Sequence, residues 1–224
     1  MNKTNVVKVL TLLSLVLGAA SANAGLLCSG VDYNGDLSTT DVTFRGDNAD
    51  DCYGKMSGND TGNQGTGIDT LNAAFGPSWE LLAKDDNPTS GTSDSGSFMD
   101  VNFTLSSTAG TSGSWTLSWE EQVVDALPLT MDFAAVLKSG TGYGIYFFDD
   151  ETFADETGNG TGTGNGTWEI SFLNNGGNIG AISHFSLYVR EGTPPPPPSV
   201  PEPGTLFLMG LGLLGLARAR KALV

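Results

Sequence analysis

The clearest set of potential metal ligands lies near the N-terminus, where Asp32, Asn34 and Asp36 occupy alternate positions. Alternate carboxylate and amide side chains that converge on one hard cation are how a calcium-binding loop begins. A loop of the EF-hand type would end on a carboxylate, but Thr43 stands at that position. The Asn34-Gly35 pair also favours a tight turn between two strands. The sequence therefore leaves two hypotheses, a calcium site or a hairpin turn, and suggests no other cofactor.

Catalytic chemistry finds little support elsewhere in the chain. His184 is the single histidine, and we expect it to be a strand residue that donates to a neighbour or faces solvent. Asp149 and Asp150 are adjacent, and adjacent side chains on a strand point to opposite faces, so they predict no ready-made chelate. A glycosidase needs two facing carboxylates, whose separation a sequence does not reveal. We therefore expect no enzyme, with a polysaccharide-active hydrolase as a distant alternative.

The charge distribution narrows the class of partner. All 25 acidic residues lie between Asp32 and Glu202, together with only five of the ten basic residues, so this segment has a net charge near −20. Such a charge repels phosphate backbones and excludes nucleic acid as a partner. It favours solubility or the binding of divalent cations.

Short apolar runs separated by Gly, Asn, Asp and Ser are the elements that must position these residues. Several runs place aromatic or β-branched side chains at every second position, the period of a half-buried strand. The pattern predicts an all-β fold, an antiparallel β-sandwich or jelly-roll-like single domain over residues 25–192. One short helix is expected over Asp69–Phe75, with Asp69 as its cap. The expected strands are Val42–Phe44, Trp79–Lys84, Phe98–Leu105, Trp115–Trp119, Met131–Leu137, Tyr143–Phe148, Trp168–Phe172 and Ile182–Val189.

Two low-complexity segments are expected to be irregular. Gly158–Gly166 alternates glycine with Thr and Asn and has no lysine to meet a phosphate, so we expect an exposed loop and no nucleotide site. Pro194–Pro198 lie within a linker of residues 193–199, where consecutive prolines favour an extended polyproline II spacer.

The first residues have the features of a secretory signal peptide. Lys3 and Lys8 precede an apolar run, and Ala22 and Ala24 form the small-residue pattern that predicts cleavage after residue 24. Export through the secretion machinery places the two cysteines in an oxidising compartment. A disulfide between Cys28 and Cys52 is then favoured over a metal pair or a catalytic thiol.

The C-terminal segment, residues 200–224, has three parts. Pro201-Glu202-Pro203 comes first, an uncharged run rich in Leu and Gly follows over Thr205–Ala217, and a basic cluster closes the chain. The run is short for a transmembrane segment, which favours a transient anchor over a lasting one. The basic cluster comprises Arg218, Arg220 and Lys221. This tripartite pattern resembles the PEP-CTERM sorting signal.

The resemblance implies a destination more than an activity. It implies processing by an exosortase-type membrane enzyme, transient anchoring at the inner membrane, and release to the cell surface or the extracellular space. It also implies a protein of biofilm or exopolysaccharide matrix in a Gram-negative host, and it supplies no catalytic residues. We expect a non-enzymatic structural component of the matrix. The alternative is a carbohydrate- or calcium-binding module that contacts extracellular polysaccharide through exposed aromatic side chains.

Overall fold

The computed structural model describes residues 28, 37–86, 88 and 93–193. The predicted signal peptide, the calcium motif at Asp32, Asn34 and Asp36, and the sorting segment 200–224 lie outside these residues. Among the described residues, no helix is both long and apolar enough to cross a membrane.

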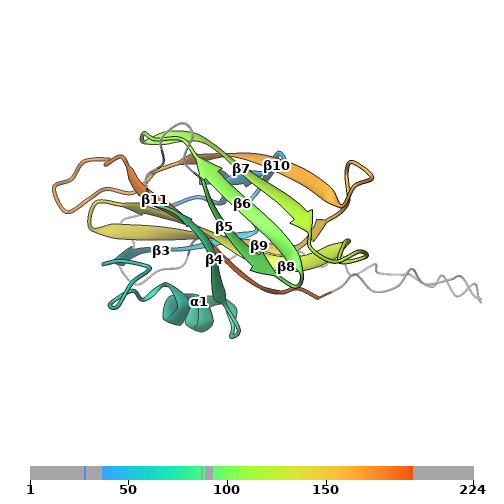
Figure 1. The fold of residues 1–224 in the computed structure, drawn as a ribbon. Helices are drawn as coiled ribbons and strands as arrows, with labels where there is room; N and C mark the ends of the chain where they lie inside the picture. The colour runs from blue at the N-terminus through green and yellow to red at the C-terminus, as the bar shows by residue number, and fades with distance from the viewer. Residues whose placement is uncertain (1–27, 29–36, 87, 89–92, 194–224) are drawn as a thin grey trace, which may run out of the picture.

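Antiparallel strands form two main sheets, in the orders β10-β7-β6-β5 and β3-β9-β8-β11-β4, with a small sheet of β1 and β2 beside them. The sheets stack into a sandwich-like domain, which confirms the predicted all-β antiparallel fold (Figure 1). The elements are β1 (Thr43–Phe44), β2 (Asp47–Asn48), β3 (Asp51–Ser57), α1 (Gly67–Phe75), β4 (Glu80–Asp85), β5 (Asp94–Phe98), β6 (Val101–Ser107), β7 (Ser112–Glu121), β8 (Leu129–Ser139), β9 (Gly142–Phe153), β10 (Thr161–Glu169), β11 (Ile182–Glu191) and a short 3-10 helix, Thr39–Asp41.

The strand expected over Phe98–Leu105 is two strands. Phe98 pairs with Val101 across a two-residue turn that joins β5 to β6. Met99 and Asp100 in that turn have φ angles of 48° and 61°. Two successive left-handed residues match the right-handed twist of the flanking strands, so the chain reverses there instead of continuing.

The main core lies between the two sheets and is rich in aromatic side chains. Phe133 stacks on Phe148 with ring centroids 4.5 Å apart, and Phe44 meets Phe133 edge-on at 5.2 Å. All four tryptophans are buried, each with 4% or less of its surface exposed. The exposed aromatic side chains that a stacking-type carbohydrate module would use are therefore not provided by tryptophan.

Helix α1 covers the outer face of the five-stranded sheet and so adds a third layer (Figure 1). Leu71 of α1 is fully buried and packs in a second cluster with Val136 and Ile145. The helix begins earlier than predicted, with Thr66 at its N-cap, and Asp69 lies in its first turn. Gly76 ends it with a φ of 88°, a conformation that glycine adopts without strain.

Strand β10 corrects the expectation of a loop over Gly158–Gly166 from Thr161 onward, while residues 158–160 precede the strand. Its inward positions are Gly162, Gly164, Gly166 and Trp168, and a Cβ at Gly162 or Gly164 would lie 2.3 Å from the ring of Trp119 or Phe44, respectively. The glycines therefore make room for aromatic rings that other strands contribute. The alternation of a buried strand is present, but at the three glycine positions the apolar side chains come from neighbouring segments.

The free edge of β10 is covered by the segment around β1. Val42 forms an isolated bridge with Trp168, and the Arg45 N–H donates to the Asn165 carbonyl at 2.8 Å. The Thr167 N–H donates to Thr43 Oγ1 at 2.9 Å. These bonds satisfy backbone groups of β10 that would otherwise face solvent.

The outer face of the four-stranded sheet, hereafter the hydroxyl face, is uniform in composition. Its outward positions alternate with the buried positions of β5, β6, β7 and β10, and all but two of them carry Ser, Thr or Asn. The exceptions are Glu120 and Glu169. The hydroxyl face comprises Ser95, Ser97, Asn102, Thr104, Ser106, Ser112, Ser114, Thr116, Ser118, Glu120, Thr161, Thr163, Asn165, Thr167 and Glu169.

The two cysteines form the predicted disulfide. Cys28 and Cys52 are bonded, and both side chains are buried in the main core. The bond fastens the start of the domain to β3.

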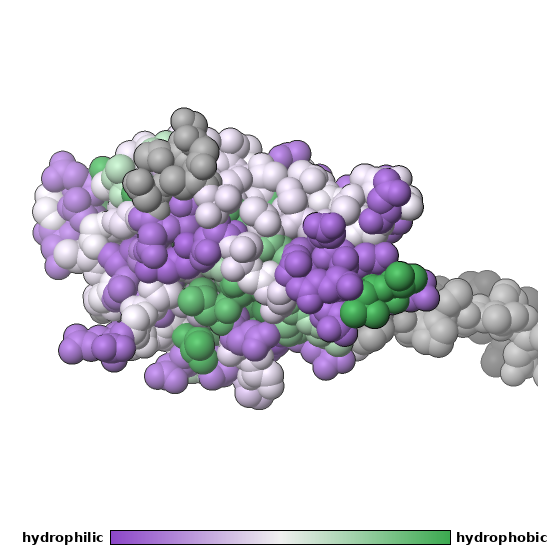
Figure 2. Space-filling model, in the orientation of Figure 1, coloured by the Kyte–Doolittle hydropathy of each residue, from purple (hydrophilic) through white to green (hydrophobic). Residues whose placement is uncertain are grey.

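In the face drawn in Figure 2, hydrophobic side chains form small separate patches. The large hydrophobic residues that are exposed in the described part are Ile68, Leu81, Met99, Val123, Val124 and Ile179.

Candidate functional site

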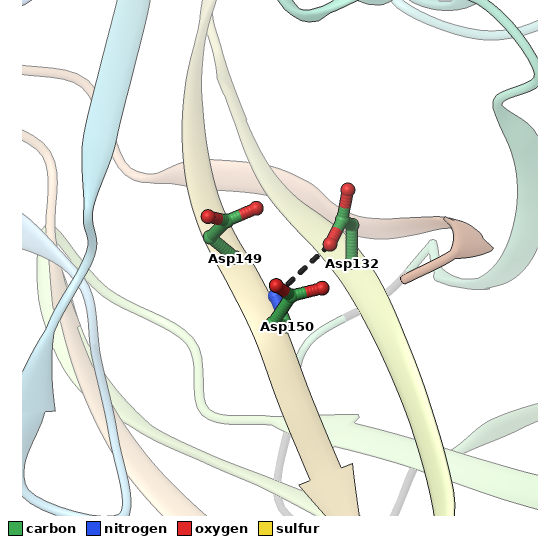
Figure 3. A group of neighbouring side chains, drawn as sticks. All are labelled: Asp132, Asp149 and Asp150. Atoms are coloured by element: carbon green, nitrogen blue, oxygen red, sulfur yellow. Dashed lines mark hydrogen bonds between the residues drawn. The ribbon is translucent and has the colours of Figure 1, made fainter. Parts of the chain in front are cut away.

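Three aspartates converge on the outer face of the five-stranded sheet. Asp132 comes from β8, and Asp149 and Asp150 come from β9 (Figure 3). One carboxylate oxygen from each lies within 4.8 Å of the others. Asp132 is buried, whereas Asp149 and Asp150 are exposed. This is the arrangement among the described residues that most resembles a metal centre.

A β-bulge brings the two adjacent aspartates to the same side. Met131 pairs with Glu151 and Phe133 pairs with Phe148, so Asp132 alone opposes both Asp149 and Asp150. Asp150 has a φ of 50°, which rotates its side chain away from the position that regular alternation predicts. The expectation that adjacent carboxylates point to opposite faces is therefore wrong at this point in β9.

Protein donors already occupy much of the cluster. Arg190 donates to Asp132 Oδ2 through Nε at 2.7 Å, and its Nη2 lies 2.6 Å from the same oxygen. The Asp150 N–H donates to Asp132 Oδ1 at 2.9 Å, and Asp150 Oδ1 accepts the Thr193 N–H at 2.5 Å. A cation at this cluster would have to compete with Arg190 for Asp132.

Arg190 also reaches beyond the acids. Its guanidinium lies over the Trp79 ring at 4.7 Å and donates to the Phe75 carbonyl at the end of α1. Arg190 and Asp132 are direct neighbours on β11 and β8. Asp132, Asp149, Asp150 and Arg190 together tie the last strand, β11, to α1, β8 and β9 near the end of the described chain. We call these four residues the exit clamp.

The electrostatics of the exit clamp are uneven. Partial burial raises the pKa of Asp149, and the neighbouring carboxylates of Asp132, Asp150 and Asp50 raise it further, against the opposing effect of Arg190. Asp149 is therefore held among like charges with its ionised form disfavoured. An added proton or cation would relieve this repulsion.

His184 lies in a second buried polar group, at the other end of the same sheet face. Its Nε2 lies 2.5 Å from Asp60 Oδ1, and the Asp60 side chain is fully buried. The Tyr188 hydroxyl donates to the Asp60 carbonyl and lies 3.2 Å from its Oδ2. Burial alone would raise the pKa of Asp60, but the hydrogen bond and charge of His184 outweigh it and lower this pKa. His184 therefore fastens the segment before α1 to β11.

The structure describes only some of the residues that the sequence predicted to be functional. The Cys28–Cys52 pair is present, while the calcium motif Asp32, Asn34, Asp36 and the sorting residues Pro201, Glu202, Pro203, Arg218, Arg220 and Lys221 lie outside the described residues. The sequence did not predict that Asp132 and Arg190 lie beside Asp149 and Asp150. The one feature that could have indicated it is that Asp132 and Arg190 are charged residues within largely apolar strands.

The comparison with known families identifies the C-terminal segment. Residues 199–221 match the family described as the PEP-CTERM protein-sorting motif. This match confirms that the tail is a sorting signal of the kind it resembles. The motif implies an exported protein that is processed by an exosortase and sorted to the cell surface. Neither the curated proteins nor the solved structures gave a significant match to the chain.

Proposed function

We propose that this chain is a non-enzymatic structural component of an extracellular polysaccharide matrix, which its sorting tail delivers to the cell surface. The observation that carries the proposal is the sorting motif at residues 199–221. The motif supplies the destination, and the sandwich is the part that would act there.

The chemistry of the domain is consistent with a structural role. His184 is bonded to a buried carboxylate, and Asp132 accepts hydrogen bonds from Arg190 and Asp150. In both places, groups that could act as a base or a ligand are engaged in holding strands together. The buried disulfide and the dense aromatic core favour persistence outside the cell.

The dependence of the matrix on the amount of protein tests the proposal. The host gene is deleted and the full chain is restored from a titratable promoter, while extracellular protein and retained polysaccharide are measured together. A structural component acts in proportion to its amount, so retained polysaccharide should rise with extracellular protein until binding sites are filled. A hydrolase would act at trace amounts and release soluble sugar fragments.

A sorting variant provides the matched control. Replacement of Pro201, Glu202 and Pro203 by alanine leaves the sandwich unchanged and should leave a full-length precursor in the membrane, with no recovery of retained polysaccharide. Recovery by this variant at the same cellular amount would contradict a role outside the cell. Full recovery at trace amounts of the unaltered chain would contradict a structural role.

A further inference from the structure

A groove of about 480 Å³ lies on the hydroxyl face. Its floor is formed by neighbouring rows of the sheet, in which Thr163 pairs with Ser118 and Ser118 pairs with Thr104. The adjacent row contains Glu120 and Asn102. Hydroxyl and amide groups that both donate and accept hydrogen bonds therefore line it at the regular spacing of a sheet.

The loop that joins β9 of one sheet to β10 of the other forms one wall of the groove. Asp155 Oδ1 accepts the N–H groups of Gly158 at 2.8 Å and Thr157 at 3.0 Å, which fixes the loop. Glu156 in the same wall is held by Arg45 at 2.9 Å and by the Thr163 N–H at 3.1 Å. The wall is thus bonded to the floor, and a ligand would meet a site that is already ordered.

The charges around the groove decide which ligands fit. No lysine or arginine occupies an outward position of the hydroxyl face, while Glu120 and Glu156 both line the groove. Carboxylates accept hydrogen bonds from sugar hydroxyls and repel uronate, sulfate or phosphate groups. The sheet is twisted, so its rows of side chains cannot match a ligand with a flat, crystalline surface. A flexible polymer chain can follow the twisted rows.

We propose that this groove binds a short segment of a neutral polysaccharide, whose hydroxyl groups exchange hydrogen bonds with Thr104, Ser118, Thr163 and Asn102 and donate to the carboxylate of Glu120. The inference rests on the proposed matrix function and names its ligand class. Ser118 Oγ lies 3.2 Å from Thr163 Oγ1, and Asn102 Oδ1 accepts from Ser97 Oγ at 2.6 Å. Each contact to sugar therefore replaces a hydrogen bond to water or to a neighbouring side chain, so single sites bind weakly. A long polymer that engages many copies of the protein gains strength from multivalency.

A second copy of the chain is a poorer occupant of the groove. Two copies would bring together two domains that each carry a net charge near −20, and serine and threonine side chains bury little apolar area. Many residues over the upper part of Figure 2, where β7 and β10 lie in Figure 1, are pale and so of intermediate hydropathy.

The test titrates the full chain, in a detergent without a sugar headgroup, with cellohexaose, laminarihexaose, maltohexaose, mannohexaose and hexagalacturonate. Amide NMR shifts locate binding, and calorimetry measures it. At least one neutral hexasaccharide should shift the amides around Thr104, Ser118 and Thr163, and hexagalacturonate should not. The double variant Thr104→Val with Thr163→Val should weaken binding at least tenfold with the melting temperature unchanged.

Ser112→Ala with Ser114→Ala, at the far end of the same face, is the control and should leave binding unchanged. The inference is overturned if no neutral hexasaccharide binds, if the shifts lie elsewhere, or if the control weakens binding equally. Concentration-dependent dimerisation that blocks the groove would also overturn it, in favour of a second copy. If polysaccharide retention still tracks protein amount while no neutral sugar binds, the matrix function survives and only this assignment fails.

Discussion

The two outer faces of the sandwich handle polarity in opposite ways. The face of the five-stranded sheet is covered in part by α1 and holds carboxylates with side-chain partners, Asp60 with His184 at one end and Asp132 with Arg190 at the other. The hydroxyl face is open, carries no basic outward residue, and relies on small neutral side chains. Buried charges must be paired, whereas exposed hydroxyls can be exchanged for water at little cost. We therefore expect stability to reside on the covered face and binding on the open one.

Two arginines give the sharpest form of this comparison. Arg190→Met leaves the Asp132 carboxylate buried without its partner, and should lower the free energy of unfolding by about 3 to 5 kcal/mol. Arg45→Met breaks a more exposed pair with Glu156 and should cost about 1 kcal/mol. Urea denaturation of both variants measures the difference. Equal losses would show that the covered face has no special role in stability.

Substitutions at the inward glycines test whether the stability of the four-stranded sheet depends on its inward side and not on its outward hydroxyl face. A Cβ at Gly166 would lie 2.0 Å from the Thr43 carbonyl and 2.2 Å from Trp115 Nε1, two atoms that share a hydrogen bond. Gly166→Ala should therefore cost about 2 kcal/mol through overpacking. Ser114→Ala, an outward residue on the neighbouring strand, should change stability by less than about 0.5 kcal/mol. Thermal unfolding of the pair shows whether the inward and outward halves of the sheet differ as expected.

The pH dependence of stability tests the pairing on the covered face. Because the folded pKa of Asp60 lies below its ordinary value, its contribution is complete above about pH 4 and is lost as the pH falls through the folded value. Asp60→Asn should cost about 1.5 kcal/mol at neutral pH. The loss relative to the unaltered chain should shrink as the pH falls below 4. A difference that stays constant across this range would refute the ionic role of Asp60.

Asp149 should show the opposite sign. Its folded pKa is raised, so its ionised form destabilises the fold at neutral pH. Asp149→Asn should stabilise the protein by about 0.5 kcal/mol at pH 7, and the gain should vanish as the pH falls below about 4. Added calcium should reduce the same gain if the cluster takes up the ion. Denaturation with and without calcium, at both pH values, separates these effects.

Sequence patterns predicted the sandwich where a strand carries its own apolar half, as in β7 with Trp115, Leu117 and Trp119. They failed at β10, where aromatic rings from β7 and β1 occupy the space beside the inward glycines. Periodicity describes one segment at a time, so it does not reveal side chains that another segment contributes. The exit clamp was missed for a related reason. A bulge and one left-handed residue set its geometry, and neither has a signature in side-chain alternation.

The covered edge of β10 has a consequence for molecules packed at high concentration. An unprotected strand edge is a template on which further chains can add, and a strand with few charges and no proline is prone to this. β10 has one charged residue and no proline, and Val42, Thr43 and Arg45 already occupy its edge. Fibril growth along β10 would first require that segment to detach. A second copy therefore finds no open backbone along β10 while that segment stays in place.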